Sequence, residues 1–389
     1  MTTHTDPIAA ARAMRNRIRA VAAEIEQTQR LPAGLVQELR DGGFFSLLVP
    51  ATIGGGGVDP ITAARVVEEL AHADGSVGWC VMLAMQSGGF EAFLPESTAR
   101  EIWGGHGIVC GTARPIGRAV ATSSPAPGFV VSGRWPFASG SSHADWFIGE
   151  CIVYDGEQPR RDAQGQEVSR AVMMPRSAVT VYPTWQTTGL RGTASNDFSV
   201  EGAFVPETHC FQMLITPPRE LTPLNQAPAL VFMNHGAHAL GVARSALDAG
   251  REAIATKIGW GGVPLRDQPR FQTVLAEATA LVEAASAYLY GAAEDLWATV
   301  NGRDPHAAST AAPLRARLRL AASHAARSSV QAVDLLHGAL ATSAIFTQSP
   351  LDRPFRDIHT AAAHVMIGPL TFEAAGRVAL GIESGFPFF

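Results

Sequence analysis

Residues 271–289 read FQTVLAEATALVEAASAYL. Apolar side chains recur in this stretch every three or four residues, which is the spacing of one face of an α-helix. A second long stretch, 307–341, is rich in alanine, and small side chains let helices approach closely. Because long helices with such faces commonly pack as a four-helix bundle and supply oligomer interfaces, we predict a helical bundle in the C-terminal part of the chain.

Two regions of different character precede this bundle. Residues 1–105 read as helical, with helix starts at Pro32 and at Asp59-Pro60. Between 106 and 215, short apolar runs alternate with turn-forming residues such as Asp155-Gly156, a pattern typical of an all-β module. The polar segment 158–169 indicates an exposed hairpin tip or loop. We therefore expect an α+β chain with three domains, which are N-terminal α-helical (1–105), central β-barrel or β-sandwich (106–215) and C-terminal four-helix bundle (216–389).

The composition excludes several classes of protein. Of the 389 residues 47% are hydrophobic and 17% charged, and the net charge of −5 does not favour a nucleic-acid binder. Four widely spaced cysteines without a Cys-x-x-Cys pair argue against a zinc knuckle, an iron–sulfur cluster or a disulfide framework. Residues 1–19 lack the apolar core of a signal peptide, and no apolar run of about 18 residues exists to span a membrane. We expect a cytoplasmic protein.

Motifs for nucleotides and metals are missing as well. No Gly-x-Gly-x-x-Gly follows a strand, and the glycines at 54–57 lack the Gly-Lys-Ser/Thr of a phosphate loop, so we interpret them as a turn between two helices. His235 and His238 have no acidic neighbour in sequence, and we expect no metal. Asp357 and His364, seven residues apart, fall on one stripe of a helix and could face one cavity. A lone histidine is more often a core or surface residue than a catalyst, so spacing alone leaves the role of His364 open.

Several stretches together resemble the acyl-CoA dehydrogenase superfamily, in the right order from about residue 20 to the C-terminus. The similar stretches are VPATIGGGG (49–57) with VEELA (67–71), GFVVSGRWPFASG (128–140), TGLRGTAS (188–195) continuing to Val205-Pro206, LGVAR (240–244) and FRD (355–357). Each is weak alone, but the ordered set is specific. The resemblance implies the fold of that superfamily and a flavin cofactor.

Two departures separate the chain from true dehydrogenases. Their catalytic glutamate follows the Arg-Asp pair, and Val365, which cannot accept a proton, stands in its expected place. The acidic and serine contacts of their β domain are also replaced, by TARPIGR at 112–118. Both departures resemble the oxygenase components of two-component flavin-dependent monooxygenases, similar to p-hydroxyphenylacetate hydroxylase and dibenzothiophene monooxygenase. That branch shares SVGW (76–79), FASG (137–140) with HADW (143–146), and a histidine seven residues after the Asp of Arg-Asp.

This resemblance implies a reaction. Such an enzyme takes reduced FMN or FAD from a separate NAD(P)H:flavin reductase, forms a C4a-hydroperoxyflavin with O₂ and hydroxylates an aromatic or polycyclic small molecule. The site must exclude water and supply a hydrogen bond near flavin N5, which suits a serine hydroxyl. A histidine that gives and takes a proton near neutral pH would assist oxygen transfer.

The resemblance also implies the residues of the site. It assigns His364 and Ser139 to catalysis, with Thr112, Phe137, Gly140, Trp79 and Gln272 joining Ser139 at the cofactor, and with Trp79, Ser87, Phe232 and His235 at the substrate. We expect a homotetramer. Two alternatives stay open at this point. The first is an acyl-CoA dehydrogenase or oxidase with tightly bound FAD and its base elsewhere, and the second is a degenerate flavin-fold protein that binds no flavin.

Overall fold

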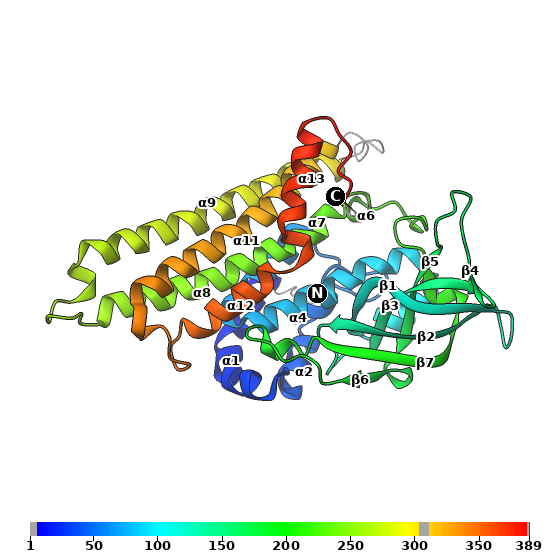
Figure 1. The fold of residues 1–389 in the computed structure, drawn as a ribbon, viewed down its shortest axis with the longest axis horizontal. Helices are drawn as coiled ribbons and strands as arrows, with labels where there is room; N and C mark the ends of the chain where they lie inside the picture. Colours follow the sequence, from blue (N-terminus) through cyan, green and yellow to red (C-terminus); the bar gives the residue numbers. More distant parts are fainter. Residues whose placement is uncertain (1–5, 303–310, 387–388) are drawn as a thin grey trace.

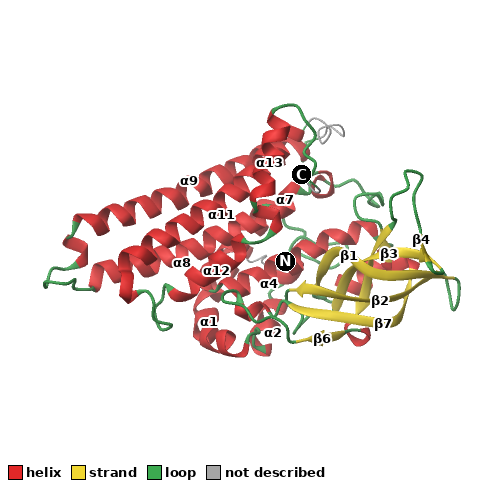
Figure 2. Ribbon diagram, viewed as in Figure 1, coloured by secondary structure: helices red, strands yellow, loops and turns green. Residues whose placement is uncertain are grey.

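The computed structural model describes residues 6–302, 311–386 and 389. Helices from both ends of the chain pack together, and a single sheet lies at one side of them (Figure 1). Colouring by secondary structure shows the same division, with the strands gathered away from the long helices (Figure 2). No helix of the described part is both long and apolar enough to cross a lipid bilayer.

The N-terminal helices enclose a buried apolar helix. They are α1 (Pro7–Thr28), α2 (Ala33–Asp41), α3 (Pro60–Ala73), α4 (Gly75–Ser87) and α5 (Glu96–Trp103). Asp59 and Asp74 cap α3 and α4 by accepting hydrogen bonds from the first free backbone N–H groups of each helix. Helix α4 is apolar on nearly all sides because it packs against α3, α8 and β1, and it continues into the 3₁₀ helix η2 (Gly88–Phe93).

The strands form one mixed eight-stranded sheet. They are β1 (Val109–Thr122), β2 (Gly128–Ala138), β3 (Trp146–Asp155), β4 (Gln158–Pro159), β5 (Ser169–Pro175), β6 (Thr180–Tyr182), β7 (Asn196–Pro206) and β8 (Cys210–Phe211). The order is β6-β7-β2-β1-β3-β5-β8, with β4 paired to β3. Only β1 and β3 run parallel, and the other pairs are antiparallel.

Two irregularities in this sheet lie at the end nearest α4. The register of β1 against β3 shifts after Thr112, and that of β2 against β7 shifts between Trp135 and Ala138. Phe137, within the second shift, has a left-handed backbone with φ of 67°. Such bulges redirect the side chains that follow them. Ser139, the residue after β2, is thereby placed beside α4.

The C-terminal helices build the bundle around an alanine-rich core. They are α6 (Pro223–Gln226), α7 (Ala229–Phe232), α8 (Asn234–Thr256), α9 (Pro269–Val300), α11 (Ala312–Leu340), α12 (Asp352–Ala362) and α13 (Pro369–Ala379). Helices α8, α9 and α11 lie side by side along most of their length (Figure 1). The predicted fold class and the helix at 271–289 are confirmed, and residues 307–310 of the second predicted helix lie outside the described part.

One expectation about the C-terminal region is wrong. Asp357 and His364 do not share a helical stripe, because α12 ends at Ala362 and His364 begins the separate 3₁₀ helix η8 (Val365–Ile367) as its N-cap. The division into 1–105, 106–215 and 216–389 stays a prediction. The polar segment 158–169 is largely exposed and contains the Arg161–Glu167 bridge of a small hairpin, as expected.

Candidate functional site

A cavity of about 780 Å³ lies where α4, η2, the first residues of β1 and the segment before α8 meet. Most of its lining is apolar, including Leu83, Phe90, Phe93, Ile148, Phe211 and Phe232. Among the predicted site residues, Ser139, Thr112, Ser87 and Phe232 line this cavity. A concave, mainly apolar space with a few polar groups is the usual form of a small-molecule site.

A chain of buried hydroxyl groups runs inward from the cavity wall. Trp79 donates from Nε1 to Ser139 Oγ over 3.1 Å, and Ser139 Oγ lies 2.6 Å from Ser195 Oγ. Ser195 Oγ in turn lies 2.6 Å from Thr193 Oγ1, which donates to the carbonyl oxygen of Leu190 over 2.9 Å. Thr193 belongs to the 3₁₀ helix η4 (Arg191–Thr193). The four contacts form a continuous line from the indole to a backbone carbonyl.

The ends of this chain fix the direction of every bond in it. A carbonyl oxygen only accepts and an indole N–H only donates. Thr193 therefore accepts from Ser195, and Ser195 accepts from Ser139. Ser139 donates its one hydroxyl proton to Ser195 and accepts a hydrogen bond from Trp79. Its hydroxyl oxygen therefore has one lone pair left, which can accept a hydrogen bond from a group in the cavity.

Three histidine rings pack against the Trp79 indole. The rings of His235, His238 and His364 lie edge-on to it, with centroid distances of 5.6, 5.1 and 5.5 Å. His235 and His364 also stack on each other at 4.6 Å. The structure thus brings Trp79, Ser139, His235 and His364 into one cluster, although the sequence separates them by up to 285 positions, from residue 79 to residue 364.

The hydrogen-bond partners of these histidines determine which nitrogen carries the proton. His364 Nδ1 accepts from the backbone N–H of Met366 over 3.3 Å, so its Nε2 carries hydrogen in the neutral form. His235 Nδ1 faces the carbonyl oxygen of Phe232 at 3.2 Å, which leaves its buried Nε2 as an acceptor without a partner among the described residues. The two stacked rings therefore offer one donor and one acceptor.

Burial keeps these rings neutral. It lowers the pKa of His238 to about 4, and together with the charge of Arg319 it lowers the pKa of His364 to about 4. Burial is the main cause that lowers the pKa of His235 well below its usual value, and electrostatic interactions with His364 and Arg319 lower it further. His364 is thus a neutral hydrogen-bond donor at neutral pH, which differs from the expectation that it titrates there.

The turn after α12 decides which side chain faces the cluster. Val365 is 54% exposed, whereas the preceding residue, His364, contacts Trp79. Asp357 is used elsewhere, because its Oδ1 accepts from the backbone N–H of Leu190 over 2.6 Å. It thereby fastens η4, and with it Thr193, to α12.

The remaining predicted residues lie in different surroundings. Ser87 donates its hydroxyl to the carbonyl of Ala84, so its proton is used within α4. Gly140, with φ of 85°, donates its N–H to the carbonyl of Thr193 and fixes the turn after β2. Phe137 is 56% exposed and touches the Trp185 ring rather than Trp79.

Gln272 is not brought to the cavity within this chain. Its amide donates to the carbonyl of Arg266, and it lies in the first turn of α9. That helix begins at the end of the bundle farthest from the sheet (Figure 1).

Sequence reasoning missed four residues of this region. Thr193 and Ser195 lie in the stretch 188–195 that resembles the superfamily, and His238 was weighed only as a metal ligand, but none of the three was assigned to the site because hydroxyl groups in a turn and a histidine on a helix are common. Arg319 could have been found, since it shares the spacing of Ala322, Ala326 and Ser329 on a buried face of α11.

Comparison with known proteins places this chain in a family. Two models of acyl-CoA dehydrogenases match, the N-terminal domain over residues 8–94 and the C-terminal domain over 233–369. The chain is 31% identical over 370 residues to an indole-3-acetate monooxygenase of Pseudomonas putida, covering 94% of this chain and 91% of that protein. It is 28% identical over 375 residues to the flavin-dependent monooxygenase oxygenase subunit HsaA of Mycobacterium tuberculosis, covering 90% and 89%. The chain belongs to the flavin-dependent monooxygenases of the acyl-CoA dehydrogenase fold.

The shape of the whole chain agrees with this family. The crystal structure of a 3-HSA hydroxylase from Rhodococcus sp. RHA1 superposes with a TM-score of 0.88 at 25% identity, covering 99% of this chain and all of that one. The described residues contain no cluster of histidine, cysteine and carboxylate groups able to hold a metal ion.

The cavity of this monooxygenase fits a flavin ring. Isoalloxazine is a flat, largely apolar system with hydrogen-bonding nitrogens at its edge, and the apolar lining with Ser139 and Thr112 on one wall matches that chemistry. The unspent lone pair of Ser139 is a ready acceptor for a ring N–H. Ser139 and Thr112 are therefore the residues that would hold the ring edge.

Proposed function

We propose that this monooxygenase hydroxylates an aromatic small molecule in the 780 Å³ cavity, with reduced FMN or FAD supplied by a separate NAD(P)H:flavin reductase. The observation that carries the proposal is the one-way hydroxyl chain ending at Ser139 on the cavity wall. Reduced flavin, when bound, would supply the two electrons that activate O₂, so that one oxygen atom enters the substrate and the other leaves as water.

Ser139 discriminates between the redox forms of the cofactor. Reduced flavin carries a hydrogen on N5 and oxidised flavin does not, so N5 changes from donor to acceptor on oxidation. Because the Ser139 proton is committed to Ser195, its oxygen would accept a hydrogen bond from N5–H of the reduced form and would repel the bare N5 of the oxidised form. An unsatisfied buried pair of acceptors costs about 1–3 kcal/mol, which corresponds to roughly tenfold to a hundredfold in affinity.

His364 supplies a proton donor that does not itself carry charge. Its Nε2–H can donate to an oxygen atom of the cofactor or the substrate, while the Met366 N–H holds the opposite nitrogen. A donor held in place by the backbone stabilises negative charge that develops in its direction. His364 thus acts as a fixed hydrogen-bond donor that orients the reacting oxygen atom, and it does not act as an acid or base that titrates near neutral pH.

The cavity lining excludes water from the reaction. Phe90 and Phe93 from η2 pack on Phe211 of β8 with ring centroids 5.4 and 5.6 Å apart. An apolar wall of this kind removes the water that would promote loss of hydrogen peroxide before oxygen transfer.

An aromatic substrate is supported by the same lining and by the relatives. Flat rings match the Phe-rich walls, and one relative is named for indole-3-acetate, a two-ring compound. We place Trp79, Ser87, Phe232 and His235 around the substrate, and Thr112, Phe137 and Gly140 at the cofactor. Gln272 would reach the cofactor of a neighbouring subunit.

A binding and turnover experiment tests this function. The protein is titrated anaerobically with reduced FMN and reduced FAD, and separately with the oxidised forms, by equilibrium dialysis. Tighter binding of either reduced form, and NADH-driven oxygenation of an indole only when a flavin reductase is added, are the expected results. Equal affinity for both redox states together with no oxygenated product would contradict the proposal.

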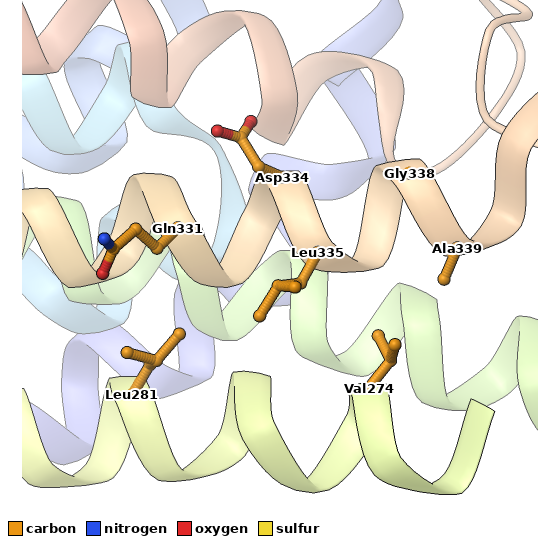
Figure 3. A pocket seen from close by; sticks show the side chains of 7 residues that line it. All are labelled: Val274, Leu281, Gln331, Asp334, Leu335, Gly338 and Ala339. Atoms are coloured by element: carbon orange, nitrogen blue, oxygen red, sulfur yellow. The ribbon is translucent and has the colours of Figure 1, made fainter. Parts of the chain in front are cut away.

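We further propose a cytoplasmic homotetramer. A hollow of about 630 Å³ on the outside of the bundle lies between α9 and α11. Its lining combines the apolar residues Val274, Leu281 and Leu335 with Gly338, Ala339 and the polar residues Gln331 and Asp334 (Figure 3). Exposed apolar surface along two long helices suits a second copy of the chain. The free cysteines Cys80, Cys110, Cys151 and Cys210 suit a reducing compartment.

The assembly is tested by light scattering after size exclusion. Leu335→Asp should shift the protein to a smaller oligomer, because it replaces one of the three large apolar side chains of the hollow with a charge. Arg251→Ala on the outside of α8 should not change the oligomer. An unchanged mass in Leu335→Asp would contradict this interface.

A further inference from the structure

Arg319 on α11 is a fully buried cation without a counter-charge. Its side chain is 0% exposed, and no described carboxylate forms an ion pair with it. One nitrogen, Nη2, donates to the carbonyl oxygen of Met366 over 3.0 Å. The other two nitrogens, Nε and Nη1, are buried and have no hydrogen-bond partner within residues 6–302, 311–386 and 389.

Such an arrangement is costly unless something completes it. Burial lowers the pKa of Arg319 only to about 10, so the group remains a cation at neutral pH. An uncompensated charge in a protein interior costs several kcal/mol, and buried donors are nearly always paired. No described residue supplies this partner, and an anion entering from the cavity would match the free donors in charge.

The guanidinium lies directly behind one wall of the cavity. Its central carbon is 5.2 Å from the centroid of the Phe232 ring, and Phe232 lines the cavity. Its charge also acts on His235 and His364. Phe232 is half-buried at the last position of the short helix α7, so a change of its side-chain rotamer would open a path from the cavity to the guanidinium. A group carried on a short arm from a ring in the cavity would then meet the free N–H groups.

We propose that Arg319 binds the carboxylate of an aromatic carboxylic acid, and that such acids are the substrates of this monooxygenase. The inference rests on the proposed function. A carboxylate matches the free guanidinium nitrogens in charge and hydrogen-bonding geometry, and a ring with a short acid side chain would place the ring in the cavity and the acid beyond Phe232. Arg319 thereby selects acids over neutral rings of the same shape.

The test compares indole-3-acetate with two neutral probes. Indole-3-acetamide has the same shape without the charge, and indole lacks the side arm altogether. Their dissociation constants are measured by equilibrium dialysis without flavin, and their oxygenation is measured with reductase, NADH and O₂. Charge-assisted hydrogen bonds are worth about 1.5–3 kcal/mol, so the acetate should bind roughly tenfold to a hundredfold tighter than the amide. Equal binding of acetate and amide by the native protein overturns the proposal.

Variants on one helix sharpen the comparison. Arg319→Gln should bring the acetate-to-amide ratio close to one, and Arg319→Lys should restore part of the preference. Arg317→Gln is the matched control, because Arg317 is an exposed arginine of α11 paired with Asp295. It should keep the native ratio. Retention of that ratio in folded Arg319→Gln overturns the proposal, and if this variant does not fold, the native ratio decides alone.

The two hypotheses fail in different ways. Oxygenation of neutral indole without preferential binding of the acetate removes the Arg319 site and leaves the proposed function standing. Preferential binding of the acetate without oxygenation of any probe contradicts the proposed function and leaves the anion site standing.

Discussion

Ser139 shows how a single hydroxyl acquires a direction from its neighbours. A serine in water donates and accepts with equal ease, but here Trp79 at one end and the Leu190 carbonyl at the other remove that freedom. Ser195 and Thr193 carry the constraint between them. The chemical selectivity of the wall therefore resides in four groups, of which sequence analysis singled out Trp79 and Ser139.

Replacing Ser139 with Ala should remove the preference for reduced flavin. The variant lacks the acceptor, so we expect the reduced-form affinity to fall by roughly tenfold and the hydrogen peroxide released per NADH to rise. Equilibrium dialysis and a peroxide assay measure the two effects. Ser132→Ala, on the same strand but bonded to the Gly202 N–H, is the control. Native behaviour of Ser139→Ala in both assays would remove it from the site.

His364 should determine coupling without producing a titration near neutrality. Because its pKa lies at about 4, we expect it to cause no change in product yield between pH 6 and 8, and a loss only as the pH approaches 4, where the cation no longer accepts from the Met366 N–H. His364→Leu should release more hydrogen peroxide at every pH. A step near pH 6.5 that disappears in this variant would contradict the neutral assignment.

At the scale of elements, the site depends on how closely η4 approaches α12. A Cβ built on Gly189 would lie 2.0 Å from the carbonyl oxygen of Arg356, so only glycine allows the contact. Asp357 closes it by accepting the Leu190 N–H at 2.6 Å. The loop that carries Thr193 and Ser195 is thus held by a helix some 160 positions away in sequence.

Asp357 should be needed as an acceptor rather than as a charge. Burial and the nearby Asp74 raise its pKa to about 7, so its carboxyl group is partly protonated at neutral pH. We expect Asp357→Ala to lower the free energy of unfolding by about 1–3 kcal/mol and Asp357→Asn, which retains Oδ1, to lower it by much less. Denaturant unfolding measures both. Equal losses in the two variants would show that the negative charge, and not the hydrogen bond, matters.

At the scale of the whole molecule, buried histidines link stability to pH. Burial is the main cause of a lowered pKa in His143, His235, His238 and His364. An unfolded histidine takes up a proton below about pH 6.5, whereas these folded ones do not until about pH 4 or lower. Each therefore destabilises the fold as pH falls through that window. Asp357 and Glu150, whose pKa values are raised to about 7, act in the opposite sense, so single variants are needed to see the effect.

His143 offers the cleanest measurement because it lies in the sheet region, outside the Trp79 cluster. Between pH 6.5 and 4 we expect the free energy of unfolding to decrease in both proteins, but less in His143→Gln than in the native protein. The difference between the two decreases should be at most ~3 kcal/mol. Thermal or denaturant unfolding at several pH values gives the difference. Parallel curves for the two proteins would contradict the assignment.

Much of the fold follows from local patterns, and less of the site does. The apolar face at 271–289 and the turn residues between strands suffice for helix, sheet and their order, because periodicity reports which side is buried. The resemblance supplied Ser139 and His364 as candidates. The hydroxyl partners Thr193 and Ser195 and the cation Arg319 depend on contacts between distant segments, which no single-sequence spacing contains.

The short turn after α12 has a consequence for how this fold changes its chemistry. The residue that points inward there is set by the two turn positions between α12 and η8, 363 and 364, and not by the packing of a helix. Deleting one residue in this turn would bring Val365 toward the indole of Trp79 and send His364 to solvent, while α12 and its bond to Leu190 stay intact. The length of this turn therefore decides which chemical group the fold presents to the indole.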